Sequence, residues 1–138
     1  MTGSSLRALT RAALAALVFF ALAAVDLALR SRSALQEARR HELWRDNPAA
    51  KAAWAESKFP SQNADTRTKA LREAEKKFLL TESSAKMAYV WYKTAAEEFR
   101  LPFNPWAAEA RRRLPAALEA WKTELAAAGV KAEPWMLK

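Results

Sequence analysis

The stretch AALAALVFFALAAV, residues 12–25, decides how this chain is organised, because it is apolar and carries no charge. Asp26 interrupts it, and Leu27, Ala28 and Leu29 extend it as far as Arg30. Fourteen residues are few for a membrane-crossing helix, which needs about twenty, but the eighteen residues from 12 to 29 are enough. The sequence therefore predicts one N-terminal transmembrane helix.

A secretory signal peptide is the competing interpretation of this segment. Arg7 and Arg11 would form its basic region, and Ala21-Leu22-Ala23 would be its cleavage site. We expect a retained anchor, because a cleaved signal would be absent from the mature protein and this chain still begins at Met1. The residues expected to form the anchor are Ala12, Leu14, Leu17, Val18, Phe19, Phe20, Leu22, Val25, Leu27 and Leu29.

Asp26 lies about one turn from the end of the apolar segment. At that depth its carboxylate can reach the lipid headgroups, which is the interpretation we favour. The alternative is a polar contact with the helix of a neighbouring subunit, since an acid inside a span usually faces protein or water. Asp26 is therefore one of the residues that we predict at a partner interface.

The orientation of the predicted span is open. Arg30, Arg32, Arg39, Arg40 and Arg45 follow it closely, and only two arginines precede it. Counted directly, the positive-inside rule places the C-terminal part in the cytoplasm, but the rule weakens for long translocated domains. Because the N-terminal pattern is typical of a signal-anchor, we expect a single-pass protein of the bacterial inner membrane with a periplasmic C-terminal domain.

The composition predicts an all-α fold. The chain has 33 alanines, only two glycines and no isoleucine, and alanine is the best helix former while glycine is among the worst. Its 138 residues allow one domain plus an anchor. We divide it into an N-terminal tail and anchor (1–30), a helical stalk (31–46), a helical domain (47–129) and a C-terminal tail (130–138).

Capping patterns place the helices of the domain. Asn47 with Pro48, and Asn104 with Pro105, match an N-cap followed by proline at the first helical position. Thr81 is a plausible cap for a helix over residues 82–100. A preceding helix from about residue 65 carries an amphipathic stripe at three-to-four spacing, made of Ala70, Leu71, Ala74, Phe78 and Leu79.

The last helix should carry a long apolar stripe that keeps its phase across Pro115. Proline inside a helix removes a backbone donor and clashes one turn back, so we expect a kink or a tight joint there. Gly129 is a natural residue to end this helix. The stripe consists of Trp106, Ala110, Leu114, Leu118, Trp121 and Leu125.

The net charge of the whole chain is +8, and residues 30–138 carry 21 basic and 14 acidic residues, which gives +7. Such an excess suits lipid headgroups or an acidic protein face. The densest cluster, Arg111, Arg112 and Arg113, is therefore a candidate partner contact, although a solvated helical surface explains it as well. No nucleic-acid-binding motif accompanies these charges, so we expect no nucleic acid partner.

Six tryptophans are many for a domain of this size. Trp91, Trp106 and Trp121 lie on apolar stripes and are expected in the core. Tryptophan is favoured at protein interfaces and at membrane surfaces. We therefore predict that at least two of the remaining three contact a partner or lipid; the candidates are Trp44, Trp54 and Trp135, together with Met136 beside the last of them.

Catalytic motifs are missing from the sequence. With glycine only at positions 3 and 129, a phosphate-binding loop is impossible, and there is no cysteine and only one histidine, His41. Paired acids such as Glu97 and Glu98 do not share a helical face. We therefore expect no enzyme, no cofactor, no metal and no small-molecule substrate.

Residues 85–114, AKMAYVWYKTAAEEFRLPFNPWAAEARRRL, show one further pattern. A helix with a Tyr/Ala/Phe face turns through a Pro-containing loop into a helix with small contact residues. This resembles one helical hairpin of the tetratricopeptide-type (TPR-like) repeat family, and the resemblance implies a helix-pair scaffold that binds protein. It covers a single repeat, whereas about three are usually needed for stability, and two antiparallel helices of any bundle would give the same pattern. The matching residues are Tyr92, Ala96, Phe99, Pro102, Asn104, Ala107, Ala110 and Leu114.

These observations favour a non-catalytic accessory or scaffolding subunit of a larger membrane complex, respiratory, photosynthetic or secretory. Its expected partners are integral membrane subunits, membrane lipid and an acidic protein face. The alternative is a free-standing, membrane-anchored TPR-like adaptor that recruits soluble proteins.

Overall fold

The computed structural model describes residues 3–60, 64–99 and 101–137, and within these ranges it contains helices and no strand. This confirms the predicted all-α fold. The elements in chain order are α1 (Gly3–Asp46), α2 (Pro48–Lys58), α3 (Thr66–Thr81), α4 (Ser84–Glu97), α5 (Pro105–Ala127) and the short 3₁₀ helix η1 (Pro134–Leu137).

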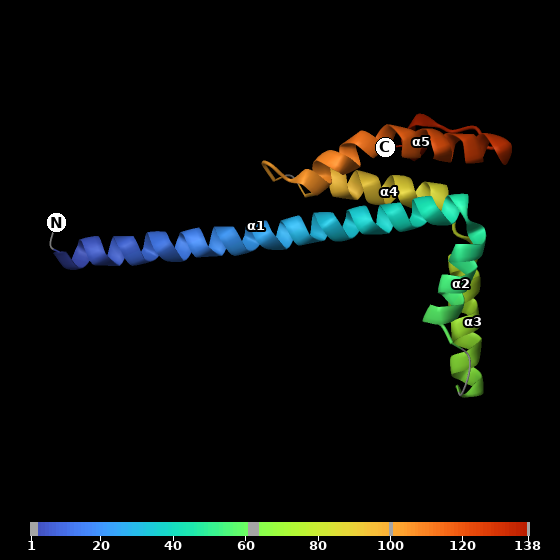
Figure 1. The fold of residues 1–138 in the computed structure, drawn as a ribbon, viewed down its shortest axis with the longest axis horizontal. Helices are drawn as coiled ribbons and strands as arrows, with labels where there is room; N and C mark the ends of the chain where they lie inside the picture. Colours follow the sequence, from blue (N-terminus) through green and yellow to red (C-terminus); the bar gives the residue numbers. More distant parts are fainter. Residues whose placement is uncertain (1–2, 61–63, 100, 138) are drawn as a thin grey trace.

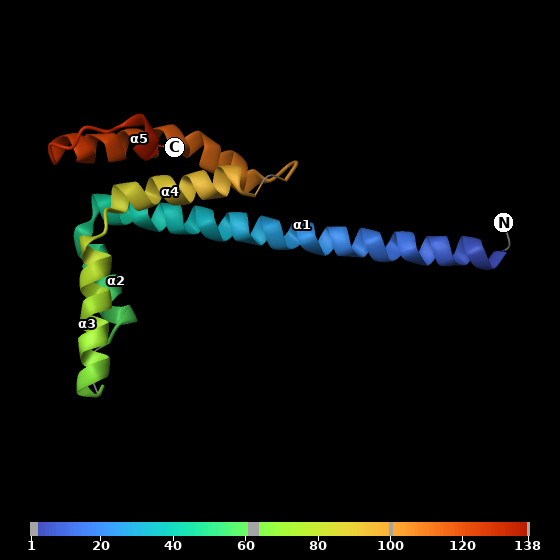
Figure 2. The same cartoon turned by 180° about the vertical axis from the view of Figure 1, so that it is seen from behind.

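The helix α1 runs the whole length of the molecule (Figure 1). Its 44 residues extend about 66 Å at a rise of 1.5 Å per residue. The α4–α5 hairpin lies along its C-terminal half, and α2 with α3 leaves its end on the opposite side, so that the chain has an L-shaped outline (Figures 1 and 2). We call the α2–α3 hairpin the arm. The N-terminal half of α1 projects alone among the described residues.

The core is built on small residues. In the stack of α1, α4 and α5, α4 occupies the middle and packs against both neighbours. Ala38, Ala95 and Ala110 have no exposed surface, so alanine is present where the three helices approach most closely. The one large side chain buried completely on α4 is Tyr92. Because alanine needs little space and favours helix, the same residues form the helices and allow them to pack tightly.

Polar contacts set the register of α4 on α1. The Ser31 hydroxyl donates to the Ala95 carbonyl at 3.3 Å. The Tyr92 hydroxyl donates to Glu42 at 2.6 Å, and Arg113 of α5 donates to the same carboxylate oxygen at 3.1 Å. Burial and the hydrogen bond to Glu42 raise the pKa of Tyr92 to about 12, so the phenol keeps its proton. One carboxylate thus joins three helices.

The segment expected as a stalk, residues 31–46, is helical as predicted, but it is also one wall of the core. Ser31, Leu35, Ala38 and Trp44 are buried against the rest of the chain. The few apolar residues of this segment suggested a stalk without protein contacts. Their spacing nevertheless lets one face of the helix pack against α4, because the facing residues of α4 are small.

The predicted caps are largely confirmed. The side chains of Asn47 and Asn104 accept hydrogen bonds from the first turns of α2 and α5, each of which begins with proline. Thr81 is not the cap of α4, as the sequence suggested. It is the last residue of α3, and Ser83 caps α4 by accepting from the Lys86 amide at 3.0 Å.

Two predictions for α5 concern Pro115 in its interior and Gly129 at its end. The helix passes through Pro115 as one element from Pro105 to Ala127. Gly129 follows it with φ +71°, a left-handed conformation that glycine adopts without steric cost, and the Val130 amide bonds back to the Leu125 carbonyl. Gly129 therefore ends the helix as predicted.

Replacing Ala110 by leucine should destabilise the helix stack. Ala110 is fully buried, and extra methylene groups in a close-packed core cost about 1–3 kcal/mol. Thermal unfolding in mild detergent, followed by circular dichroism, should show a lower midpoint. The same substitution at Ala116, an exposed residue of the same helix, should leave the midpoint unchanged, and equal losses for both would contradict the packing argument.

Candidate functional site

The junction between α1 and the arm is a cluster of aromatic and cationic side chains, which we call the elbow. It consists of Arg40, His41, Trp44, Lys51 and Trp54. Only Asn47 separates α1 from α2, and the sharp turn there places Trp54 on Trp44, with ring centroids 4.8 Å apart. His41 meets Trp44 edge to face at 4.9 Å. The direction of the arm is therefore set by aromatic packing.

Cations cover the aromatic rings of the elbow. The Arg40 guanidinium lies 5.5 Å from the Trp54 ring, and Lys58 Nζ lies 4.5 Å from the same ring. Such contacts contribute about 0.5–1 kcal/mol when exposed. The buried Lys51 donates to the Glu82 carbonyl at 2.5 Å, which fastens α2 to the segment joining α3 and α4.

His41 is the unusual residue of the elbow. It is 6% exposed, and its Nδ1 is buried without a hydrogen-bond partner in the described structure. Burial, followed by the charges of Lys51 and Arg40, lowers its pKa from 6.5 to about 4. The imidazole is thus neutral at pH 7. Among the described residues, no three His, Asp or Glu side chains are placed to hold a metal ion together.

A hollow of about 390 Å³ opens beside the elbow, between α1, the arm and α4. Trp44, Trp54 and Trp91 contribute to its lining, and so does Met87. Because Arg40 already covers the ring faces of Trp44 and Trp54, these aromatic surfaces are used within the chain. The elbow is best understood as the joint that holds the arm.

The two helices of the arm meet through polar contacts. Lys76 of α3 bridges Glu56 of α2 at 2.8 Å and Glu73 at 3.0 Å, and Arg72 donates to the Pro60 carbonyl. No described residue of α3 is buried. The side of α3 that faces α2 is thus its more polar side.

The apolar side of α3 faces away from α2. Leu71 is 60% exposed and Phe78 is 69% exposed, with Ala74 between them on the same helical face. We call these three residues the arm stripe. The sequence predicted an amphipathic stripe here, but the structure buries none of it, and only Leu79 is half-buried toward the elbow. Among the described residues, nothing buries this apolar face, so the arm stripe is a candidate contact surface.

The predicted interface tryptophans separate in the structure. Trp44 is buried in the elbow and Trp54 is half-buried against it, so Trp44 is not available to a partner. Its burial was missed because the turn at Asn47 folds α2 back on α1. Trp135 is 73% exposed in the C-terminal tail and remains a candidate contact.

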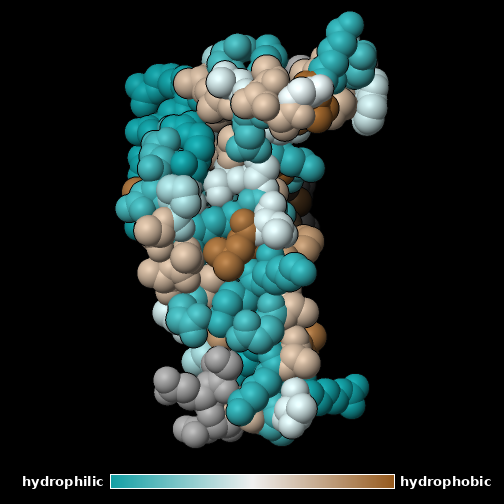
Figure 3. Space-filling view, turned by 90° about the vertical axis from the view of Figure 1, so that its right-hand side faces the viewer, coloured by the Kyte–Doolittle hydropathy of each residue, from teal (hydrophilic) through white to brown (hydrophobic). Residues whose placement is uncertain are grey.

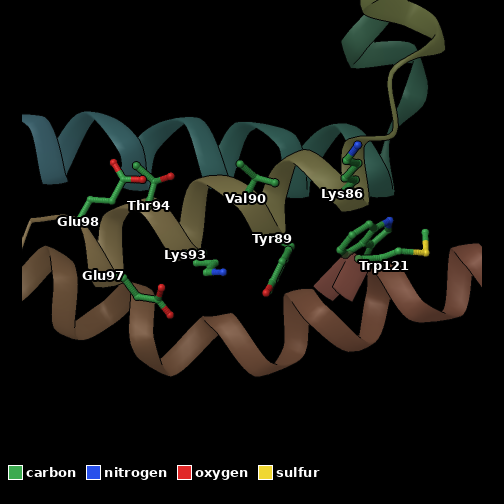
Figure 4. A pocket seen from close by; sticks show the side chains of 9 residues that line it. Lys86, Tyr89, Val90, Lys93, Thr94, Glu97, Glu98 and Trp121 are labelled. Carbon is green, nitrogen blue, oxygen red and sulfur yellow. The ribbon is translucent and has the colours of Figure 1, made fainter. Parts of the chain in front are cut away.

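Met136 lies in a hollow of about 260 Å³ between α4 and α5. Tyr89 reaches from α4 toward α5 and stacks on Trp121 with ring centroids 5.4 Å apart (Figure 4). Lys93 and Glu97 lie along the same hollow. The tail thus folds back over α5, and Met136 is half-buried rather than freely presented.

Two of the three clustered arginines are used within the chain. Arg111 donates to the Ala96 carbonyl at 3.3 Å, and Arg113 pairs with Glu42 and Glu109, each at 3.1 Å. The hydrogen bond from Arg39 lowers the pKa of Glu109, with Arg113 adding to the effect. All three arginines are exposed, but Arg111 and Arg113 hold α5 to α4 and α1, so Arg112 is the better candidate for a partner contact.

Most of the apolar part of α1 is exposed. Among the described residues, one helix is long and apolar enough to cross a membrane, and its best window of 18 residues has a mean hydropathy of 2.4 with none of it buried in the chain. Asp26 pairs with Arg30 one turn later, at 2.8 Å. Most of the predicted anchor residues are exposed, whereas Leu27 is half-buried and Val25 shares a hollow with the α4–α5 turn. The one acid in this segment is paired with a cation of its own helix.

The opposite end of the molecule is hydrophilic. Viewed along α1 from the elbow, the surface of α5 and the arm is mostly polar, with apolar atoms in isolated patches (Figure 3). Among the described residues, most of the exposed large apolar side chains belong to α1, and Leu71 and Phe78 of the arm stripe are among the others. Comparison with protein-family models, with curated proteins and with solved structures finds no match to this chain.

The neutral, buried His41 makes stability depend on pH. Its folded pKa of about 4 is below the ordinary 6.5, so the unfolded chain binds this proton first as pH falls. The contribution of neutral His41 to the free energy of unfolding should therefore be complete above pH 6.5 and be lost as the pH falls toward 4. Denaturant unfolding in detergent between pH 7.5 and 4.5 measures this decline.

His41→Phe is the matched variant, because it keeps an aromatic ring against Trp44 and removes the only histidine. Its free energy of unfolding should vary less over the same pH range. An unchanged slope would mean that His41 does not carry the pH dependence.

Proposed function

We propose that this chain is a non-catalytic, single-span accessory subunit that scaffolds a larger membrane complex by binding neighbouring subunits. Its α1 anchors it in the bilayer, and the arm reaches sideways to a neighbour. The main observation behind the proposal is the arm stripe, an apolar helical face that the described residues leave exposed.

The position of the arm supports this proposal. From Arg30, where the apolar segment ends, to Asp46, where the arm begins, α1 rises about 24 Å. The arm then leaves α1 on the side opposite α4 and α5 (Figure 1). If α1 stands across the bilayer, the arm lies beyond the membrane surface and to one side of α1, at the level of the extramembrane part of a neighbouring subunit.

Charge supports a protein or lipid partner of opposite sign. Residues 30–138 carry a net charge of +7, and among the described lysines and arginines only Lys51 is buried. An acidic face on the neighbour would be attracted before the apolar contact forms.

We assign the protein to the bacterial inner membrane with its C-terminal part periplasmic, in a complex of the respiratory, photosynthetic or secretory kind.

The anchor is tested by one charge in the span. Phe20→Arg places a cation near the middle of the apolar segment, which costs about 2.5–3.5 kcal/mol for insertion. The fraction of full-length chain that stays in membranes after alkaline carbonate extraction should fall sharply. Val130→Arg, outside the span, should behave as wild type. Recovery of a chain that lacks its first 23 residues would overturn the anchor in favour of a signal peptide.

The scaffold role is tested through the arm stripe. The tagged full-length chain, extracted in mild detergent, should migrate on a native gel with a large assembly at fixed stoichiometry, as identified by mass spectrometry. Replacing Leu71 and Phe78 together by serine should release it, since fully burying a Leu or Phe side chain stabilises by about 1.5–3 kcal/mol.

Both side chains are exposed, so the double serine variant should keep the wild-type helix content and unfolding midpoint. Val130→Ser, an equally conservative loss of an exposed apolar side chain, should stay in the assembly. If the wild-type chain migrates alone, or with variable soluble proteins, the accessory role is excluded. A free-standing TPR-like adaptor would then be the better proposal.

A further inference from the structure

The turn between α4 and α5 lies beside the apolar part of α1. Residues 101–106, which we call the hairpin tip, share a hollow of about 350 Å³ with Ala24, Val25 and Ala28 of α1. The turn of the hairpin thus lies alongside the predicted span, and Figure 2 shows it directed toward the N-terminal half of α1.

The depth of the hairpin tip follows from the helix rise, given the proposed anchor. Residues 12–29 extend about 27 Å, close to the roughly 30 Å thickness of the hydrocarbon core. The far boundary of the hydrocarbon therefore lies near Arg30. Ala24 and Ala28 precede Arg30 by six and two residues, about 9 and 3 Å toward the membrane. The hairpin tip is thus level with the headgroups or just below them.

The composition of the hairpin tip suits that depth. No charged residue occurs between Leu101 and Ala108, and the segment LPFNPW contains two prolines and two aromatic residues. Trp106 is half-buried against the helix stack, and tryptophan is enriched at membrane–water interfaces. The same surface in water would be an apolar loop without a partner in the described structure.

Phe103 of the hairpin tip provides the strongest evidence for a contact with lipid. Its side chain is 101% exposed, so the rest of the chain does not bury the ring. Its φ is +63°, a conformation rare for a bulky residue. Neither the backbone nor the surrounding protein favours phenylalanine here, whereas a lipid environment would accept its ring.

We propose that the hairpin tip enters the headgroup–acyl boundary of the bilayer that α1 spans, with Phe103 as its inserted side chain. This second contact would hold the helix stack against the membrane and restrict rotation of α1 about its axis. The arm, fixed to α1 by the elbow, would then point in a defined direction along the membrane. The proposal rests on α1 being a retained anchor.

The absence of cysteine allows a direct test with single-cysteine variants of the full-length chain. Phe103→Cys, Leu17→Cys and Val130→Cys are labelled with an environment-sensitive fluorophore and reconstituted into phosphatidylcholine vesicles. Nitroxide lipids carry the quencher either at the headgroup and shallow acyl positions or deep in the bilayer. The Leu17 label reports the span, and the Val130 label reports the solvent-facing end of α5.

The label at position 103 should be quenched several-fold more by shallow nitroxides than the label at position 130, and less by deep nitroxides than the label at position 17. Quenching at 17 with solvent-like behaviour at 103 would overturn the tip contact and leave the anchor intact. That result is also expected if the tip instead contacts a neighbouring protein. Absence of quenching at 17 would overturn both proposals.

A second reporter keeps Phe103 in place. Pro102→Cys, at an exposed position, should show the same shallow quenching. Adding Phe103→Gly should reduce it, because glycine accepts the positive φ at no steric cost while the inserted ring is lost. Unchanged quenching in the double variant would exclude Phe103 as the inserted side chain, and circular dichroism confirms that each variant keeps its helix content.

Discussion

The close approach of α1, α4 and α5 through alanine is the constraint on which the rest of the structure depends. Ala38, Ala95 and Ala110 are fully buried where the three helices meet, and larger side chains there would push them apart. The approach has two consequences at opposite ends of the stack. At one end the α4–α5 turn lies beside Ala24 and Ala28 of α1. At the other, α1 is held where the arm begins.

Polar and aromatic contacts then give this stack one register and one direction. Glu42 receives hydrogen bonds from Tyr92 and Arg113, so one carboxylate ties α1 to α4 and to α5. At the elbow, Trp44 and Trp54 pack where Asn47 turns the chain, and the arm leaves α1 on the other side. Rigid placement of the arm is what the proposed scaffold role requires, because a partner must meet the arm stripe at a fixed height and direction.

The sequence predicted the helices better than the surfaces. Asn47, Asn104 and Gly129 act through local backbone chemistry, and each lies where its residue type indicated. The tryptophans were harder, because whether a large apolar side chain is buried depends on which helix folds over it. Trp44 is covered since α2 turns back, and nothing local to its own sequence signals that turn's direction. The arm stripe was visible as a pattern, but its exposure was not.

The amino-acid sequence by itself determined the all-α fold, the apolar segment of α1 and most of the helix ends. These properties depend on propensity, hydropathy and capping, which act within a few residues. Only the tertiary structure decided that residues 31–46 are core rather than bare stalk, that Arg111 and Arg113 hold α5 in place, and that the hairpin tip lies beside Ala24. Such outcomes depend on contacts between residues some tens of positions apart, because packing and ion pairing are settled by three-dimensional proximity.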